Sequence, residues 1–318
     1  MPKFSVITPC YNISSQICNI NKLLSQTFTD FELILVNDCS LDKTKELLCS
    51  IKDVLVNQNI RTILIENEEN KGAGESRNIA IQSCSGEYIV FLDSDDFFES
   101  TSLEALDSII TKNDYPEIVL FEYSVVKNGK KIQNKSFARD GFVTREKAFL
   151  HAPNGICGKC IKLSLVIDND IRFLKIRRNE DFPFFRKAFW FSSHIFYTNQ
   201  ALYNYVINEY SLMHTSEFAD PENAISAFTS ICIFCDDENL LSCLFMKNCY
   251  YSNILCMLSS PYTRAQFRNR LRYLRETYSC YYITRNLNEF SIRIRIIVWL
   301  ANFGFFNTLK VLYQLAKS

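Results

Sequence analysis

Three aspartates directly follow a short apolar run. Asp93, Asp95 and Asp96 come after residues 88–92, which read YIVFL. Carboxylates this close repel one another, and the repulsion raises their pKa values unless a cation lies between them. Hard oxygen ligands of this kind suit Mg²⁺ or Mn²⁺ better than Zn²⁺. The cluster is therefore either a solvated turn at a strand end or a divalent metal site.

The elements that must position these aspartates form a regular pattern over the first hundred residues. Short apolar runs recur about once per βαβ unit of roughly 30 residues. Continuous runs of Val, Ile, Leu and Phe are typical of strands buried on both faces of a parallel sheet. The runs are residues 4–8, 31–36, 61–66 and 88–92. Segments with helical spacing lie between them, at 14–26, 42–56 and 75–83. The pattern predicts an α/β fold with a mostly parallel sheet flanked by helices.

Polar groups follow each of these predicted strands. Residues 8–12, TPCYN, follow the first strand, and Asp38 follows the second. The stretch ENKGAGESRN (69–78) follows the third, and a Gly-rich loop that opens a helix can hold phosphate. In open α/β sheets, ligands bind at the carboxyl ends of the strands. We therefore expect all these groups and the aspartates to meet at one edge.

Composition excludes some other classes of protein. The chain has 318 residues, 47% of them hydrophobic and 22% charged, as in an ordinary globular protein. The apolar run near the N-terminus is too short for a signal peptide, and the 13 cysteines are odd in number and irregular in spacing. We expect free thiols in a reducing cytosol, and no nucleic-acid partner.

Four ordered motifs resemble the family 2 glycosyltransferases of the GT-A fold, of the bacterial surface-polysaccharide type. The similarity is close over residues 3–100 and looser to about residue 215. The motifs are SVITPCYN (5–12), LSQTFTDFELILVNDCSLDKT (24–44), NKGAGESRNIAI (70–81) and GEYIVFLDSDDFF (86–98).

The resemblance implies a set of nucleotide-binding residues. The family has Asp-Asp where this chain has Asn37-Asp38, and the second position, Asp38, matches the residue that accepts a hydrogen bond from uracil. Arg77 matches an arginine that reaches the nucleotide. The full implied set is Pro9, Tyr11, Asn12, Asp38, Arg77, Asp93 and Ser94.

The resemblance also implies a metal site and a catalytic base. Asp93-Ser94-Asp95 matches the family's DxD motif, so Asp95 is expected to ligate Mn²⁺ or Mg²⁺, with Asp93 and Asp96 as further candidates. Asp181, in RRNEDFPFFR, matches the base that takes the acceptor proton. The alternative is that Glu180 or Asp181 only caps the following helix.

Two other features allow more than one interpretation. His214, in EYSLMHTS, is either a ligand near the pyrophosphate and metal or a surface histidine. The two Cys-x-x-Cys pairs, Cys157–Cys160 and Cys232–Cys235, raise the possibility of zinc. We favour free cysteines, because the first pair lies in a segment resembling the family's acceptor-side motif, with Lys159 matching its lysine, and the second lies in an apolar helical stretch.

The C-terminal hundred residues change character. The alternation of strands and helices stops after Asp220, which predicts a catalytic domain over 1–220 and a helical region over 221–318. Within the catalytic domain we expect a nucleotide-sugar half at about 1–100 and an acceptor half at about 101–220. Residues 222–257 and 262–280 have helical spacing. From residue 261 onward, ten Lys or Arg against two Glu give +8. The apolar segment 296–309 is too interrupted to span a bilayer, so it is either an interfacial membrane helix or a packed one.

These observations favour an inverting, metal-dependent glycosyltransferase. The resemblance implies a nucleotide-sugar donor, UDP-linked, and as acceptor a growing or lipid-linked glycan such as lipopolysaccharide or capsule. It would act in the cytoplasm, at the inner face of the membrane. Two alternatives remain: an Asp-x-Asp phosphatase, whose motif usually lies on the first strand, and a non-catalytic module that binds nucleotide sugars.

Overall fold

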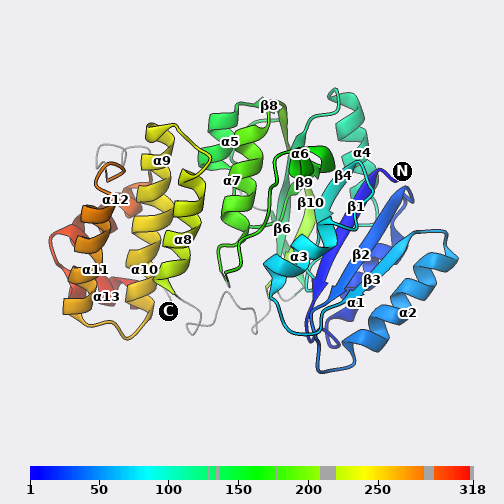
Figure 1. Ribbon diagram of the computed structural model, residues 1–318, viewed down its shortest axis with the longest axis horizontal. Helices are drawn as coiled ribbons and strands as arrows, with labels where there is room; N and C mark the ends of the chain where they lie inside the picture. Colours follow the sequence, from blue (N-terminus) through cyan, green and yellow to red (C-terminus); the bar gives the residue numbers. More distant parts are fainter. Residues whose placement is uncertain (128, 134–135, 177, 208–219, 283–289, 316–318) are drawn as a thin grey trace. The chain divides into compact units, whose positions relative to one another are not determined.

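A ten-stranded mixed sheet forms the centre of residues 1–209 in the computed structural model (Figure 1). The structure describes residues 1–318 except 128, 134–135, 177, 208–219, 283–289 and 316–318. The chain divides into two compact units, Met1–Glu209 and Tyr210–Ser318. The domain boundary predicted at residue 220 adjoins 208–219, which lie outside the described residues, so it stays a prediction.

The four predicted strands are confirmed, each within two residues at its ends. They are parallel neighbours in the order β3-β2-β1-β4, and every residue of β1, β2 and β4 is buried. The continuous apolar runs are therefore explained by helices covering both faces. The bounds are β1 Phe4–Cys10, β2 Phe31–Asn37, β3 Thr62–Glu66 and β4 Tyr88–Phe91.

The other strands extend the sheet beyond β4. Strand β9 (Lys159–Lys162) is antiparallel to both β4 and β6 (Ile118–Lys127), so β6 again runs in the direction of β4. Strand β10 (Ile195–Val206) is parallel to β6, and β5 (Phe97–Phe98) is antiparallel to the end of β10. Strands β1, β4, β6 and β10 therefore end at one edge of the sheet, which we call the carboxyl edge. Short strands β7 (Lys130–Gln133) and β8 (Gly141–Val143) pair with β6 and β10.

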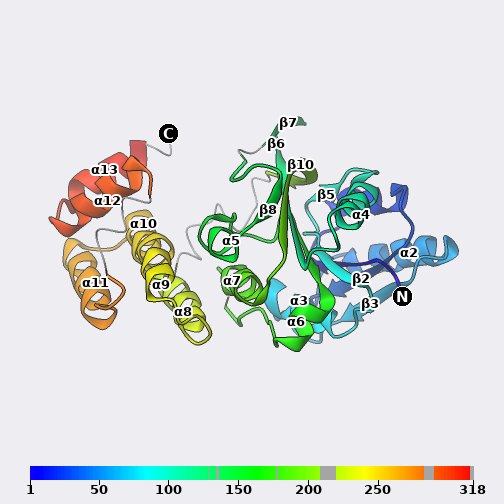
Figure 2. The same ribbon diagram turned by 90° about the horizontal axis from the view of Figure 1, so that it is seen from above.

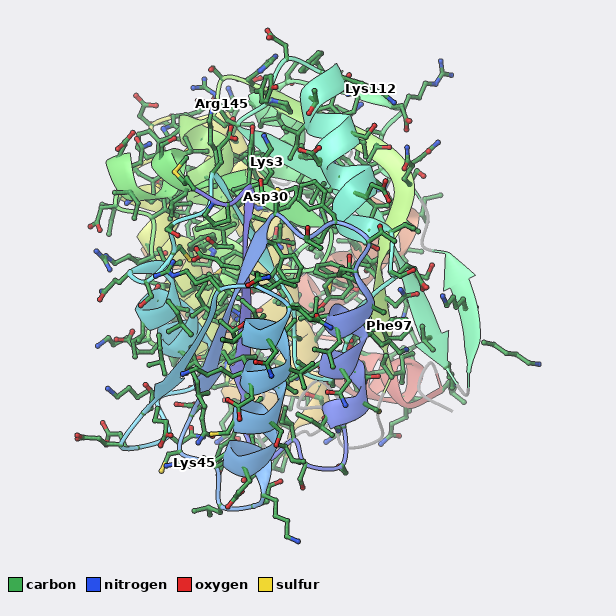
Figure 3. All side chains as sticks on the ribbon, turned by 90° about the vertical axis from the view of Figure 1, so that its right-hand side faces the viewer. Lys3, Asp30, Lys45, Phe97, Lys112 and Arg145 are labelled. Atoms are coloured by element: carbon green, nitrogen blue, oxygen red, sulfur yellow. The ribbon has the colours of Figure 1, made fainter. Side chains whose placement is uncertain are left out.

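Figure 3 shows the direction of the sheet. Lys3 and Asp30 mark the amino ends of β1 and β2, and Lys45 lies toward the opposite, carboxyl edge. Lys45 belongs to α2 (Thr44–Asn57), which begins where the loop after β2 ends. The expected α/β class with a mostly parallel sheet is confirmed.

Helices cover both faces of this sheet (Figure 2). On one face, α2 and α4 (Ser102–Lys112) pack on a core that includes Leu33, Leu48 and Leu106. On the other face, the ring of Phe91 makes edge contacts with Phe173, Phe184 and Phe185 at 5.3–6.2 Å between centroids. The helices of this second face are α3 (Ala73–Ile81), α6 (Leu163–Asp168) and α7 (Asp181–Phe191); α5 (Arg145–His151) packs on α7.

The helix predicted over 14–26 is wrong in its extent. The structure has a four-residue α1 (Ile17–Ile20) followed by a 3₁₀ turn, Asn21–Ser25. Ser and Asn are frequent here, and their side chains compete for hydrogen bonds that a helix needs. One such side chain, Asn19, donates to the main-chain oxygen of Asp95 at 2.7 Å. The segment therefore supports the carboxylate loop instead of extending as a helix.

The second unit is helical, as expected, and residues 222–257, which have helical spacing, form several helices instead of one. Helix α8 (Pro221–Cys232) is followed by α9 (Glu238–Leu244), a π-helical turn Phe245–Tyr250, and α10 (Tyr251–Ser259). The break occurs because Asp237 caps α9, accepting hydrogen bonds from the backbone N–H groups of Asn239 and Leu240 at 2.9 and 3.0 Å.

In the described part of this unit, α10 is followed by α11 (Arg264–Thr277), α12 (Ile292–Asn302) and α13 (Phe306–Leu315). Among the described residues, every helix falls short of the length and apolarity that a bilayer crossing requires. Within the apolar segment 296–309, Val298 and Phe306 are not available to face lipid. Their side chains are buried within the unit, where Phe306 packs against Phe267 at 5.0 Å between ring centroids.

Candidate functional site

The loop after β1 is locked to the loop after β2 by four hydrogen bonds. The Asn12 side-chain oxygen accepts from the backbone N–H of Leu41 at 2.8 Å, and the Asn12 N–H donates to Ser40 Oγ at 3.1 Å. Ser14 N–H donates to Asp42 Oδ2 and Ile13 N–H to the Thr44 hydroxyl. The predicted nucleotide residue Asn12 therefore shapes this loop through its side-chain oxygen.

The two other predicted residues of this loop differ in exposure. Pro9 is buried inside β1, paired in register with Val36 of β2. Tyr11 is 45% exposed at the carboxyl edge. Tyr11 therefore has an exposed ring at this edge, whereas Pro9 is enclosed in the sheet.

Asp38 anchors the Gly-rich loop. Its carboxylate is buried and accepts hydrogen bonds from the N–H groups of Lys71 and Gly72 at 2.9 and 2.8 Å, and from the Asn67 amide at 2.7 Å. Gly72 has φ +83°, a conformation that L side chains rarely adopt. Asp38 therefore lies at the expected edge, where it fixes the loop that opens α3.

Arg77, on α3, connects two acidic segments that are far apart in the sequence. Its buried guanidinium forms ion pairs with Asp93 (Nη2–Oδ1 2.7 Å) and Glu180 (Nη1–Oε1 3.1 Å), and it lies 5.4 Å from the Phe173 ring centroid. Burial alone would lower the pKa of Arg77, but Asp93 and Glu180 outweigh it and raise this pKa. The arginine predicted to reach the nucleotide thus joins the DxD loop to α7.

Gly74 makes the approach of Glu180 possible. A Cβ atom at this position would lie 2.9 Å from Glu180 Cγ and 3.2 Å from the Leu174 carbonyl oxygen. Any larger side chain would push Glu180 away from the turn that carries Arg77. The glycine is therefore required by close packing between α3 and the residues before α7.

The three predicted metal-binding aspartates come together. One carboxylate oxygen from each of Asp93, Asp95 and Asp96 lies within 4.8 Å of the others. All are oxygen donors, which fits Mg²⁺ or Mn²⁺. Ser94 lies between them and is half-buried. The donor set therefore fits the divalent cation that the sequence predicts.

Asp96 differs from the other two because it points into the fold. It is buried, and it accepts hydrogen bonds from the Tyr203 hydroxyl at 2.6 Å and the Val206 N–H at 2.8 Å. Burial, with the charges of Asp93 and Asp95, raises the pKa of Asp96 to about 9. These contacts give Asp96 a structural role in joining the DxD loop to β10.

Asp181 is the first residue of α7 and lies half-buried opposite the loop 155–158. Its Oδ2 is 3.8 Å from the position that a Cβ on Gly155 would take. Burial raises the pKa of Asp181, although Arg77 and Lys159 oppose this rise. Glu180 occupies the N-cap position but makes no side-chain capping hydrogen bond. The Glu180 side chain therefore does not cap α7, and its observed partner is Arg77.

Lys159 supports the loop that faces Asp181. It is buried on β9, and its ammonium donates to the carbonyl oxygens of Gly155 at 2.6 Å and Cys157 at 3.1 Å. Burial lowers the pKa of Lys159 to about 8. The lysine therefore shapes the loop opposite Asp181.

Other candidates lie elsewhere. His214 falls within 208–219, outside the described residues. Cys157 and Cys160 are free thiols, and among the described residues the one group of three or more His, Cys, Asp or Glu placed to hold a metal is Asp93, Asp95 and Asp96. Sequence reasoning did not identify Glu180 and Tyr203 as contacts of the site. Glu180 had a signal, its position beside Asp181, whereas Tyr203 follows Asp96 by 107 residues and had none.

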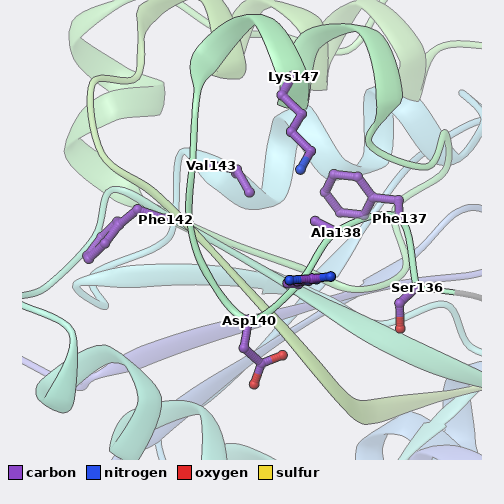
Figure 4. Close-up of a pocket in the computed structure, with 8 residues that line it drawn as sticks. Ser136, Phe137, Ala138, Asp140, Phe142, Val143 and Lys147 are labelled. Carbon is purple, nitrogen blue, oxygen red and sulfur yellow. The ribbon is translucent and has the colours of Figure 1, made fainter.

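The described residues of this unit line hollows at two places of interest. One, of about 560 Å³, adjoins β5 and the turn of Asn19; its lining includes Lys22, whose ammonium lies 3.1 Å from the Phe97 ring centroid. The other, of about 510 Å³, lies beside β8 (Figure 4), which pairs with the first residues of β10, away from the carboxyl edge. It contains none of the predicted site residues. It is lined by Ser136, Phe137, Ala138, Arg139, Asp140, Phe142, Val143 and Lys147.

Comparison with known proteins gives consistent results. Residues 5–165 match the family model described as "Glycosyl transferase family 2". The poly(ribitol-phosphate) beta-N-acetylglucosaminyltransferase TarS of Staphylococcus aureus is 28% identical over 231 residues, 70% of this chain and 39% of that protein. The UDP-Glc:alpha-D-GlcNAc-diphosphoundecaprenol beta-1,3-glucosyltransferase WfgD of Escherichia coli is 34% identical over 125 residues, 39% of this chain and 47% of that protein. The chain thus spans less than half of either relative.

Solved structures share the fold. The crystal structure of S. aureus TarS 1–349 with UDP-GlcNAc superposes with a TM-score of 0.75 at 21% identity, covering 99% of this chain and 91% of that one. A mannosyltransferase from Pyrobaculum calidifontis, in complex with GDP-Man and Mn²⁺, gives 0.57 at 13% identity, covering 99% and 87%. The likeness confirms the predicted GT-A fold class with its helical C-terminal region.

Proposed function

The chain belongs to glycosyl transferase family 2, and we propose that it is an inverting, metal-dependent glycosyltransferase. One observation carries this proposal. Arg77 contacts both Asp93 of the DxD loop and Glu180 beside Asp181, so the donor-side and acceptor-side carboxylates lie around a single guanidinium. Transfer of a sugar requires these two functions next to each other: charge neutralisation at the leaving group and proton removal from the acceptor.

The donor that we propose is a UDP-sugar. The support is the exposed Tyr11 ring at the carboxyl edge and the Gly-rich loop fixed by Asp38. The TarS crystal structures with UDP and UDP-GlcNAc and the UDP-Glc in the name of WfgD are consistent with it. Pro9, Asn12, Arg77, Asp93 and Ser94 complete the proposed nucleotide site.

The cation would be held by Asp95 and Asp93. When bound, Mn²⁺ or Mg²⁺ neutralises the charge that develops on the departing diphosphate. Asp96, with both oxygens engaged by Tyr203 and Val206, contributes by holding the loop that carries the other two. His214 remains a proposed fourth candidate.

Asp181 would act as the base. As the acceptor oxygen bonds to the anomeric carbon, its proton passes to the Asp181 carboxylate, and the bond from that carbon to the diphosphate oxygen breaks with its electron pair leaving on UDP. A single displacement inverts the configuration at this carbon. A raised pKa suits a base that must accept and later release a proton near neutral pH.

We propose a growing surface glycan, such as lipopolysaccharide or capsule, as the acceptor. The support is by analogy: TarS is named for poly(ribitol-phosphate), WfgD for a diphosphoundecaprenol-linked sugar and TuaG of Bacillus subtilis for teichuronic acid. We place the reaction in the cytoplasm at the inner face of the membrane, with a catalytic domain over 1–220 and a helical region over 221–318.

A panel of nucleotide sugars tests the function. We expect one UDP-sugar to raise the melting temperature and to be slowly hydrolysed in the presence of Mn²⁺, and hydrolysis to stop when the metal is chelated. The Asp181→Asn variant is the matched control, because it should keep the thermal shift and lose transfer. Binding of UDP without turnover of any donor and acceptor would contradict the enzyme proposal and favour a binding module.

A further inference from the structure

Helix α12 is apolar on two faces, and one of them is left uncovered within its unit. The inner face carries Val298 and Ala301, which are buried. The outer face carries a stripe at spacings of four, three and four residues, and each of its side chains is 50–67% exposed: Ile292, Ile296, Trp299 and Phe303. Apolar helix faces are normally covered by other parts of the protein, by a partner or by lipid. The exposed stripe therefore indicates a contact with something else.

The turn after α12 extends this stripe. Gly304, with φ +79°, reverses the chain and places Phe305 beside Trp299, with 6.1 Å between ring centroids; Trp299 and Phe303 are 4.7 Å apart. We call Ile292, Ile296, Trp299, Phe303 and Phe305 the outer apolar surface. Contiguous exposed side chains of this size mark binding surfaces.

Positive charge borders the outer apolar surface. Arg264 and Arg268 of α11 are exposed and lie against the turn: Arg264 Nη2 is 3.5 Å from the Gly304 carbonyl oxygen, and Arg268 Nη2 is 3.6 Å from the position of a Cβ on Gly304. The described residues between 261 and 315 contain eight Lys or Arg and one acidic residue, Glu276. The surface is thus aromatic in its centre and cationic beside it.

We propose that the outer apolar surface inserts into the interfacial region of a bilayer that contains anionic lipid. Trp and Phe side chains are favoured at that depth, and arginines beside them can pair with lipid phosphates. Helix α12 has 11 residues and lies among helices too short to cross, so it lies in the plane of the membrane. The proposal rests on the proposed function only for the identity of the membrane.

A second copy of the chain is the main competing occupant. A twofold contact centred on Trp299 would bring Arg264 and Arg268 of both copies to the border of one interface, because such an interface uses the same surface twice. Like charges across an apolar contact are unfavourable. Anionic headgroups instead complement both the arginines and the aromatic rings.

Tryptophan fluorescence reports on this contact directly. The chain has two tryptophans, Trp190 and Trp299, so the full-length Trp190→Phe variant isolates Trp299. With vesicles of mixed phosphatidylglycerol and phosphatidylcholine at low salt, we expect its emission to shift to shorter wavelength and to be quenched by brominated acyl chains. Pure phosphatidylcholine vesicles or high salt should reduce both effects, because screening weakens the charge attraction.

Matched variants test the two parts of the surface. The double variant Trp299→Ser, Phe303→Ser should lose vesicle binding in sedimentation by about tenfold or more, since two inserted rings are removed. Ile233→Ser, which removes an 84% exposed side chain elsewhere in the unit, should bind like wild type. Arg264→Glu, Arg268→Glu should also weaken binding, whereas Lys52→Glu, Lys112→Glu in the first unit, with the same change of charge, should not.

Several results would overturn the proposal. The proposal fails if the wild-type protein stays in the supernatant with anionic vesicles at low salt. It also fails if Trp299 emission does not change when these vesicles are added. Light scattering that shows a dimer, separated into monomers by Trp299→Ser, Phe303→Ser, would assign the surface to a second copy. Hydrolysis of the nucleotide sugar in the same samples separates this failure from failure of the proposed function, because every variant should keep wild-type hydrolysis.

Discussion

Arg77 and Glu180 form an ion pair, with Nη1 and Oε1 3.1 Å apart, across 103 residues of sequence. The same guanidinium holds Asp93 at 2.7 Å, so one buried cation joins α3, the DxD loop and the start of α7. Its removal would leave two carboxylates without their partner in a largely buried setting. Arg77 therefore links the stability of the site to its geometry.

We predict that Arg77→Met lowers the free energy of unfolding by about 3 kcal/mol, the low end for a broken buried pair, because Asp93 is partly exposed. Arg77→Lys should fall between wild type and Arg77→Met, since an ammonium can hold one carboxylate but not two diverging ones. Urea denaturation of the three proteins measures this order.

Arg172→Met is the control for this series. Its pair with Asp170 is exposed on both sides, so its loss should cost about 1 kcal/mol or less. Equal destabilisation by Arg77→Met and Arg172→Met would show that the buried bridge does not hold the two segments together.

Asp181→Asn should abolish transfer and leave UDP affinity nearly unchanged. The amide preserves shape but cannot take the acceptor proton, and loss of a general base costs roughly 10²-fold or more in turnover. Steady-state kinetics and calorimetry with UDP measure the two effects. Asp170→Asn, on the surface, serves as the control. If Asp181→Asn retains more than about a tenth of wild-type turnover, the base is another residue.

Most of the fold of the first hundred residues could be predicted from local sequence patterns. Strands β1 to β4 were predictable because each is a continuous apolar run, a pattern that requires cover on both faces. The edge at which Asp38 and Asp93 lie followed from the parallel order alone. The extent of the helix after β1 could not be predicted. The Asn19 side chain donates to the main-chain oxygen of Asp95, which is distant in the sequence.

Long-range partners could not be predicted in this way. Nothing in the sequence distinguishes Tyr203 from any other tyrosine in a strand. Its hydroxyl reaches Asp96 because β10 pairs with β5. The inward face of α12 was equally hard to predict, because apolar residues lie on more than one face of this helix. Periodicity cannot say which of them, Val298 or Trp299, is buried.

Asp95→Ala should remove the dependence of UDP binding on Mn²⁺. The reason is that Asp95 supplies one of the three carboxylate oxygens grouped at the end of β4, and this variant removes that metal donor. Calorimetric titrations of UDP with Mn²⁺ and with a chelator provide the comparison, and we expect the two curves of the variant to coincide.

Asp96→Ala is the contrasting variant. It removes the acceptor of the Tyr203 and Val206 hydrogen bonds and leaves those buried donors unpaired, so its main effect should be a lower melting temperature. Equal Mn²⁺-assisted UDP affinity in Asp95→Ala and wild type would remove Asp95 from the metal site.

Asp42 should contribute a stability that disappears in acid. Burial would raise the pKa of Asp42, but hydrogen bonds from Ser14 and Thr44 outweigh it and lower this pKa from 3.8 to about 2. A carboxylate with a depressed pKa stabilises the fold above its unfolded pKa, and that contribution is lost as the pH falls through the folded value.

The difference in stability between wild type and Asp42→Asn should be constant above about pH 5 and shrink between about pH 4 and pH 2. Thermal melts across this range measure it, with Asp53→Asn, an exposed aspartate of α2, as the control for acid effects elsewhere. Because Asp42 also holds Ser14, the variant should bind UDP more weakly at neutral pH. A difference that stays constant down to about pH 2 would mean that these hydrogen bonds do not favour the charged carboxylate.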